Sequence, residues 1–426
     1  MKREDHELLS RTGPGTAMGN LLRRYWMPAL LSRELEMDGA PLRVRLLGED
    51  LIAFRDSENR VGLLEEHCAH RGASLYFGKN GESGLRCWYH GWKYDIDGNC
   101  LDQPNEPPAA RFCDRVKQPA YPCVEKNGVI WTYMGPADLK PAFPELEWTL
   151  VPEGHYYASK RLQDCHWQQG MEGDLDSSHL NFLHGQETIN ASPSHGRFPS
   201  GKWMADDPNP KIEIEHTAGG IIQAARRAAG DKDYYWRIGE WLAPVFTMIP
   251  GFPGDAPFGG HAWVPMDDDK TWCFAFSWHP VRAFTETEKK NQQSGWGMHS
   301  LMRPDSFIAA HNKSNGYAPA DFPPVKQPWQ RIKIFQDQDT AITESIGARY
   351  DRTKETLGST DALIIQTRRR LMAAARDLEE GREPIISARD YRLRPYSCVL
   401  PRDTPSWVKA VEETLDARPE TYKISA

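Results

Sequence analysis

Apolar and polar residues alternate over short stretches from Leu42 onward, and Gly, Asp and Asn separate these stretches. The segments 42–56 and 61–68 show the alternation most clearly, and a further one at 127–134 follows a proline-rich connection. Such alternation is typical of half-buried strands, and the polar residues between them are typical of hairpin turns. The pattern predicts a small all-β domain over residues 21–140, preceded by an N-terminal extension at residues 1–20.

The chain beyond Pro141 shows longer strand-like stretches. They lie at 210–218, 219–229, 233–250, 259–267 and 270–280. Residues 359–378 instead carry apolar positions at near-helical spacing, and Gly381 follows them as a stop signal. We therefore expect an α+β domain over residues 141–426, in which helices pack on one side of an antiparallel sheet and a pocket is enclosed.

Length and charge limit the kinds of partner. A chain of 426 residues exceeds what one core usually supports, which agrees with two domains. The net charge of -7 gives no electrostatic reason to expect nucleic acid or an anionic membrane as a partner. No apolar run approaches the length of a membrane span, and the N-terminus is charged from its second residue. We expect a soluble, cytoplasmic protein.

Two Cys-His pairs stand close together in the first domain. One is Cys68-Ala69-His70, and the other begins at Cys87 and ends at His90. A [2Fe–2S] cluster of the Rieske type is held by two thiolates on one iron and two imidazoles on the other. Each pair supplies one ligand of each kind from one tight loop, so the two loops together match this ligand set. The pattern predicts a Rieske centre.

Zinc and a purely structural role are the alternatives for these residues. Zinc sites with two cysteines and two histidines usually pair like with like along the chain, which is not the arrangement here. The other six cysteines are scattered and lack the dense spacing of a secreted disulfide scaffold. We expect them to be reduced and mostly buried; they are Cys100, Cys113, Cys123, Cys165, Cys273 and Cys398.

A second group of metal-type ligands lies in the later domain. Asp176 and His179 would share a face of a helix, and His184 follows five residues on. Two histidines and one carboxylate form the facial triad that binds non-haem Fe(II) and leaves positions open. For the carboxylate we choose Asp339, which lies in a helical pattern. The alternatives for the carboxylate are Asp337 and Glu344, and two ordinary helical histidines with a solvated acidic helix remain the structural alternative.

Taken together, these residues resemble the oxygenase component of a Rieske non-haem iron oxygenase, most closely the phthalate 4,5-dioxygenase group. The resemblance covers nearly the whole chain and implies a helix-grip, START-like catalytic domain. It implies a cluster on Cys68, His70, Cys87 and His90, and iron on His179, His184 and Asp339. It also implies O2 as co-substrate, with electrons from NAD(P)H delivered by a separate reductase carrying flavin and a [2Fe–2S] centre.

The same resemblance implies a homotrimer or a stacked homohexamer. In that assembly Asp176 is the bridging carboxylate between an iron histidine and His90 of a neighbouring subunit. A head-to-tail ring would bring the cluster of one subunit beside the iron of the next, whereas the two centres within one chain lie in different domains.

The substrate implied by the resemblance is a small aromatic compound, most simply an aryl carboxylate of the phthalate or benzoate type that undergoes cis-dihydroxylation. Arginine recognises a carboxylate well, and Arg237 lies among aromatic residues, although a surface or inter-subunit ion pair is the alternative. Asn181 and Phe182 lie between the two histidines and are expected near the iron. Monooxygenation or O-demethylation of an aryl ether is the competing activity, and a Rieske electron-transfer protein with a binding domain is the lesser alternative.

Overall fold

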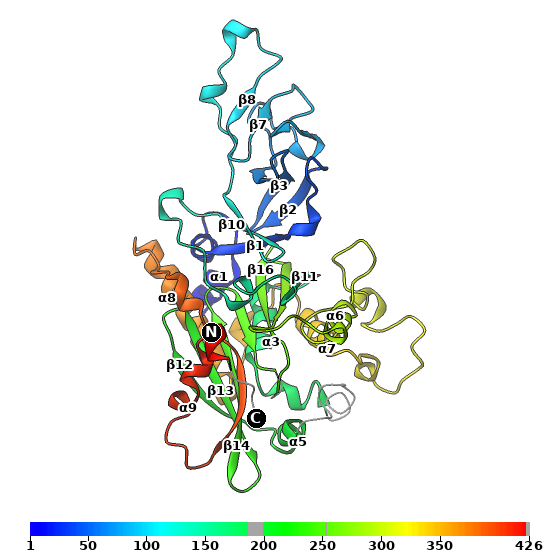
Figure 1. Ribbon diagram of the computed structural model, residues 1–426, viewed down its shortest axis with the longest axis vertical. Helices are drawn as coiled ribbons and strands as arrows, with labels where there is room; N and C mark the ends of the chain where they lie inside the picture. The colour runs from blue at the N-terminus through cyan, green and yellow to red at the C-terminus, as the bar shows by residue number, and fades with distance from the viewer. Residues whose placement is uncertain (186–198, 252–253, 423–426) are drawn as a thin grey trace. The chain divides into compact units, whose positions relative to one another are not determined.

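The computed structural model describes residues 1–185, 199–251 and 254–422 (Figure 1). The chain divides into two compact units. The smaller unit comprises Arg11–Pro141 with Pro265–Asp267, and the larger one comprises Met1–Ser10, Ala142–Val264 and Asp268–Ala426. Within the described ranges, no helix is long and apolar enough to cross a membrane.

The smaller unit is built from three antiparallel sheets. Their strand orders are β1-β10-β9, β2-β3-β4 and β5-β6-β7-β8. The elements are α2 (Ala17–Leu22), β1 (Trp26–Leu31), β2 (Leu42–Leu46), β3 (Glu49–Arg55), β4 (Val61–Glu65), β5 (Lys79–Asn80), β6 (Leu85–Arg86), β7 (Lys93–Tyr94), β8 (Cys100–Asp102), β9 (Cys123–Lys126) and β10 (Val129–Tyr133). The all-β character predicted for this part of the chain is confirmed.

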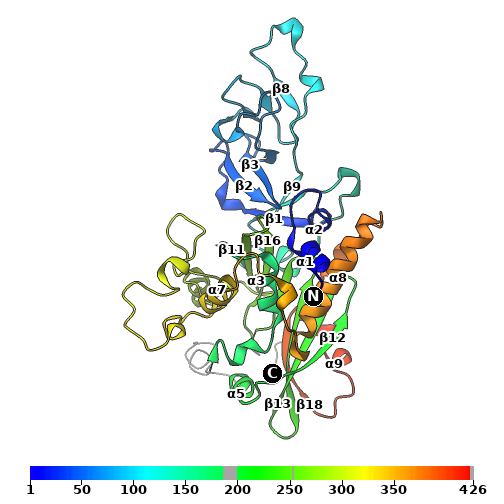
Figure 2. The same ribbon diagram turned by 180° about the vertical axis from the view of Figure 1, so that it is seen from behind.

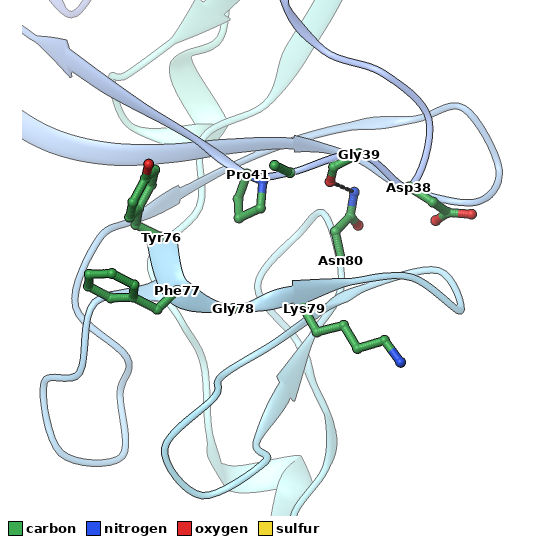
Figure 3. Close-up of a pocket in the computed structure, with 9 residues that line it drawn as sticks. Asp38, Gly39, Pro41, Tyr76, Phe77, Gly78, Lys79 and Asn80 are labelled. Carbon is green, nitrogen blue, oxygen red and sulfur yellow. Dashed lines mark hydrogen bonds between the residues drawn. The ribbon is translucent and has the colours of Figure 1, made fainter.

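One side chain joins two of these sheets. Asn80 donates hydrogen bonds from Nδ2 to the carbonyls of Gly39 at 3.0 Å and Arg55 at 2.8 Å. It lines a surface pocket together with Tyr76 and Phe77 (Figure 3). Because Asn80 is buried, these bonds replace the water that its amide loses on folding.

The larger unit is an antiparallel sheet with helices. The sheet order is β11-β17-β16-β15-β14-β13-β12, and β18 also pairs with β14. The strands are β11 (Tyr156–Gln163), β12 (Lys211–His216), β13 (Gly220–Ala229), β14 (Asp233–Leu242), β15 (Phe246–Ile249), β16 (Phe258–Pro265), β17 (Thr271–Trp278) and β18 (Tyr396–Pro401). The helices are α1 (Arg3–Ser10), α3 (Trp167–Leu175), α5 (Pro199–Asp206), α6 (Glu286–Gln293), α7 (Phe335–Ser345), α8 (Ala362–Glu379) and α9 (Trp407–Leu415).

Helices cover both faces of this sheet, whereas the sequence predicted helices on one side. On one face Ile222 and Trp236 pack against Trp407 of α9. On the other face Gln223 donates from Nε2 to the carbonyl of Leu175 at the end of α3, at 2.9 Å. The strand β13 is accordingly buried at nearly every position, as expected of a strand enclosed on both faces.

The N-terminal helix α1 packs beside α8, and both lie in the larger unit (Figure 2). An ion pair between Asp5 and Arg376 joins them. The predicted helix at 359–378 corresponds to α8, and its apolar residues Leu363, Leu371 and Ala375 are buried. Packing of α1 on α8 thus joins the first residues of the chain to its C-terminal part within the larger unit.

Candidate metal centres and substrate cavity

Two loops of the smaller unit share one backbone design. The amide of Gly72 donates to the carbonyl of Cys68 at 2.8 Å, and the amide of Gly91 donates to the carbonyl of Cys87 at 3.0 Å. Both glycines have positive φ, 72° and 80°, a conformation that other residues rarely adopt. Each cysteine therefore begins a tight turn of the same kind, and each turn presents a histidine.

The two cysteine side chains are buried and face each other. Cys68 and Cys87 are each 3% exposed, and their thiols are within hydrogen-bonding reach. The hydrogen bond between the two thiols lowers the pKa of Cys68 and raises the pKa of Cys87, and the hydroxyl of Tyr94 at 3.2 Å lowers the pKa of Cys68 further. A thiol with a lowered pKa is readily present as the thiolate that binds metal.

The two imidazoles also lie together. The ring centroids of His70 and His90 are 4.5 Å apart, and the ring of Trp92 stacks on His70 at 4.3 Å. His90 is partly exposed, and its neighbours Trp88 and Tyr89 are 76% and 58% exposed. Two buried thiols and two paired imidazoles on matching turns are the donor set that a Rieske cluster requires, so these residues fit that group.

Side chains from outside the two turns hold the loops in place. Gln118 accepts from the amide of Ala69 at 2.8 Å and donates to the carbonyls of Glu65 and His67. Arg86 donates to the carbonyl of Gly91 at 2.6 Å. Sequence reasoning did not single out Gln118, since an isolated glutamine carries no motif.

In the larger unit, two histidines and one carboxylate converge. The Nε2 atoms of His179 and His184 lie 3.5 and 3.2 Å from Oδ1 of Asp339. The candidate ligand atoms of the three residues all lie within 4.8 Å of one another. His179 belongs to a short 3₁₀ turn after α3, and Asp339 belongs to α7. The structure thus brings together the three residues predicted to bind iron.

The hydrogen bonding around His184 shows that this site suits a cation. Nδ1 of His184 lies 2.8 Å from Oε1 of Gln338, whose Nε2 donates to the carbonyl of Ile332. Nδ1 therefore carries the proton, and Nε2 carries a lone pair that points toward Asp339. Among the described residues none donates a hydrogen bond to this buried nitrogen. Two electron-rich atoms 3.2 Å apart suit a metal ion between them.

The other two carboxylates considered from sequence have other partners. Asp337 accepts from Nδ1 of His311 at 2.7 Å, and burial raises its pKa. Glu344 accepts from the hydroxyl of Tyr317 at 2.6 Å and from the amide of Asp164 at 3.0 Å. Neither belongs to the group that converges on His179 and His184.

Asp176 lies beside this group without belonging to it. The sequence predicted that Asp176 and His179 share a helical face, but α3 ends at Leu175 because the backbone of Asp176 is extended. Oδ1 of Asp176 accepts from the amide and hydroxyl of Ser178, and Oδ2 lies 3.4 Å from Nδ1 of His179. Burial raises the pKa of Asp176, but these hydrogen bonds outweigh it, and the net pKa is lowered.

Arg227 supports the same turn from strand β13. It is 1% exposed and donates to the carbonyl of Ser177 at 2.7 Å, to that of Asp207 at 3.1 Å and to Oδ1 of Asn181 at 3.4 Å. Burial lowers the pKa of Arg227 to about 10. The turn that carries His179 is therefore fixed from the sheet below it.

A cavity of about 580 Å³ opens beside the three converging side chains. His179, His184 and Asp339 line it, together with apolar side chains and a few polar ones. Among these are Leu175, Met204, Gln223, Arg237, Met248 and Phe335. The volume lies within the range of small-molecule sites, and a largely apolar wall with few polar groups is typical of them.

Of the three residues expected to contact substrate, Arg237 lines this cavity, whereas Asn181 and Phe182 do not. Asn181 is turned toward Arg227 and the carbonyl of Met204. Phe182 is 77% exposed, because the turn after α3 directs it outward. Neither residue therefore contacts the cavity, and their expected place near the iron stays a prediction.

Comparison with known proteins identifies the family. Residues 25–122 match the Rieske [2Fe-2S] domain, and residues 132–422 match the family described as LigXa C-terminal domain like. The chain is 34% identical to the 3-chlorobenzoate-3,4-dioxygenase oxygenase subunit of Comamonas testosteroni, over 97% of this chain and 98% of that protein. It is also 34% identical to the phthalate 4,5-dioxygenase oxygenase subunit of Pseudomonas putida, over 90% and 88%.

This chain belongs to the Rieske non-haem iron oxygenases. Its fold is similar to that of dicamba monooxygenase bound to dicamba, with a TM-score of 0.58 and 19% identity over 85% of this chain and 100% of that one. As a member of this family, the protein uses a [2Fe–2S] cluster and non-haem iron with O2. It receives NAD(P)H electrons through a separate reductase. The predicted family, enzyme class and cofactors are confirmed.

Proposed function

We propose that this Rieske oxygenase dihydroxylates the ring of an aryl carboxylate of the benzoate or phthalate type. The observation that carries the proposal is the cavity that the His179, His184 and Asp339 side chains share with Arg237. A guanidinium matches the geometry of a carboxylate, and the two relatives are named as oxygenases of aromatic carboxylates.

In this proposal the chain's residues have separate tasks. Cys68, His70, Cys87 and His90 would hold the cluster in residues 21–140, and His179, His184 and Asp339 would hold the iron in residues 141–426. When bound, these groups supply electron transfer and dioxygen activation. The apolar cavity wall excludes water and orients the ring, while Arg237 fixes the carboxylate end of the substrate.

Asp176 is proposed to link one subunit to the next in a head-to-tail homotrimer or in stacked trimers. The two sets of metal ligands lie in different units of the chain, and a ring would let one subunit's His90 approach the next subunit's Asp176. His90 is partly exposed, as such a contact requires. Sedimentation analysis gives the oligomeric state directly. Asp176→Asn should keep both metal centres loaded while turnover falls by more than about tenfold.

The activity is tested by a single turnover of the dithionite-reduced, reductase-free oxygenase with benzoates, phthalates and methoxybenzoates. A cis-dihydrodiol from an aryl carboxylate supports the proposal. Formaldehyde and a phenol from a methoxybenzoate would show O-demethylation instead. Loaded protein that forms no product from any of these compounds would contradict an aryl carboxylate substrate.

A further inference from the structure

Two cysteines outside the predicted ligand set lie together in the smaller unit. Cys100 belongs to β8 and Cys113 begins a short 3₁₀ turn, and both are free thiols within hydrogen-bonding reach of each other. Cys100 belongs to the buried core that also contains Cys68 and Cys87, and Cys113 packs against that core. Neighbouring thiols of this kind can be joined as a disulfide by an oxidant.

The two thiols differ in their access to solvent. Cys100 is 8% exposed, whereas Cys113 is partly exposed. Burial, together with the hydrogen bond to Cys113, raises the pKa of Cys100 to about 12, so this thiol stays protonated. A small oxidant in the solvent therefore reaches Cys113 first, and the thiol of Cys100 lies behind it. An accessible thiol beside a second, resolving thiol is the usual arrangement of a redox-sensitive cysteine pair.

The loop between the two cysteines covers the proposed cluster ligand His70. The ring of Phe112, which directly precedes Cys113, lies edge-on to Trp92 at 5.7 Å, and Trp92 stacks on His70 at 4.3 Å. Asn105, in the same loop, accepts from Nε1 of Trp92 at 2.8 Å. The packing around His70 therefore depends on how firmly this loop is held.

Cys100 is connected to a second proposed cluster ligand through its strand. It pairs with Tyr94 of β7 across the sheet, and the hydroxyl of Tyr94 lies 3.2 Å from Sγ of Cys68. A covalent bond between Cys100 and Cys113 would thus tie the covering loop to the strands that support Cys68.

We propose that Cys100 and Cys113 are a redox-sensitive pair, which hydrogen peroxide converts to an intramolecular disulfide that holds the loop over the cluster site. The peroxide oxidises the Cys113 thiol to a sulfenic acid and releases one water. The Cys100 sulfur then attacks the Cys113 sulfur, the S–S bond forms, and the Cys100 proton leaves with the hydroxyl group as a second water. The two thiols lose two electrons, which reduce the peroxide. The inference does not depend on which substrate the enzyme oxidises.

The oxidant can arise from the reactants of the enzyme itself. O2 that takes up two electrons and two protons without oxidising a substrate becomes hydrogen peroxide. A loop closed by a covalent bond opens less readily than a free one. Because this loop covers Trp92 and His70, we expect the disulfide to slow the loss of the cluster.

The test uses the full-length, cluster-loaded oxygenase without its reductase. The protein is treated with a small excess of hydrogen peroxide, blocked with N-ethylmaleimide and digested with trypsin, which cuts between the two cysteines after Arg111. Mass spectrometry should find the two peptides joined through Cys100 and Cys113, and dithiothreitol should separate them. Non-reducing electrophoresis should show a single chain, as an intramolecular bond requires.

A second readout is the rate at which excess chelator bleaches the visible absorbance of the cluster. This rate should fall about threefold or more in the oxidised protein and recover with dithiothreitol. Cys113→Ser should show neither the crosslink nor the slower bleaching, and Cys100→Ala gives the same comparison if that variant does not fold. Cys123→Ser, which changes another partly exposed cysteine of the same unit, should behave like the wild type.

Three outcomes would count against the proposal. Oxidation of Cys113 to an acid without a crosslink would overturn it. A disulfide between Cys68 and Cys87, formed as the cluster is lost, would show that the ligand thiols are the sensitive pair instead. A disulfide between Cys100 and Cys113 that leaves the bleaching rate unchanged would overturn the role given to the loop.

Discussion

Gln338 and His184 form a hydrogen bond of 2.8 Å that decides which nitrogen of the imidazole is free for metal. Since the amide nitrogen of Gln338 donates to Ile332, its oxygen must be the atom that faces Nδ1 of His184. Gln338, which directly precedes the proposed ligand Asp339, thus sets the tautomer of His184, another proposed ligand. Partners of this kind orient ligands and raise metal affinity.

Replacing Gln338 with Leu should weaken iron binding about 10- to 100-fold, because His184 loses the group that holds its ring and proton. The measurement is mononuclear iron content after dialysis against a graded chelator. The cluster absorbance should remain unchanged, since its ligands lie in the other unit. Gln293→Leu, on an exposed position of α6, is a matched control. Full iron retention at every chelator concentration would contradict the role given to Gln338.

Asp339→Ala and Asp337→Ala should behave differently although the two residues lie in one helix. Asp339 faces both histidines, whereas Asp337 is paired with His311. We expect Asp339→Ala to lower iron from about three atoms per chain to about two, and Asp337→Ala to retain about three. Elemental analysis with the visible spectrum measures both centres. The reverse pattern would mean that Asp337 is the ligand.

Cys87→Ala should remove the visible absorbance of the cluster and leave mononuclear iron in place. The thiol is buried opposite Cys68, and the loss of one thiolate leaves the cluster without a full ligand set. Cys398→Ala, a buried cysteine of the larger unit, is the control and should keep the spectrum. A normal spectrum in the Cys87 variant would exclude this residue as a ligand.

Acid stability should depend on Glu172, which lies in α3 and accepts from Arg352 and Arg368 at 2.7 to 2.9 Å. Burial by itself raises the pKa of Glu172, but the two arginines lower it by a larger amount. The pKa of Glu172 is therefore about 2, below the ordinary 4.5. Ionised Glu172 therefore stabilises the fold fully above pH 4.5, and this contribution is lost as the pH falls toward 2.

Glu172→Gln should lower stability at neutral pH by roughly 3 kcal/mol and flatten the acid limb between pH 4.5 and 2. Thermal unfolding across this pH range measures both effects. Glu286→Gln, whose side chain is 91% exposed, should match the wild type throughout. Parallel acid limbs for Glu172→Gln and the wild type would show that another group governs acid unfolding.

The ligand motifs could be predicted from sequence because they are local. Cys68 and His70, or Cys87 and His90, are held by turns of a few residues that glycine marks. Asp339 required a choice among several acids, and the partners of Asp337 and Glu344 support that choice. Gln118, Gln338 and Arg227 could not be found, since their importance comes from contacts across many residues of sequence.

The backbone at Asp176 and the layering of the larger sheet differ from the predictions. Asp176 was placed on a helix with His179, but its backbone leaves the helix and orders the following turn through Ser178. The sequence also predicted helices on one side of the sheet. In β13 the polar residue Gln223 instead bonds to a buried carbonyl, so a polar position does not mean a solvent-facing one.

The short strand β15 carries two positions that shape the cavity and one that supports the metal ligands. Met248 and Ile249 line the cavity, while the hydroxyl of Thr247 donates at 2.6 Å to Asp174 of α3, the helix that leads into the turn carrying His179. An evolving or engineered population could therefore vary Met248 and Ile249 to accept new aromatic compounds, while an unchanged Thr247 keeps the oxidative chemistry constant.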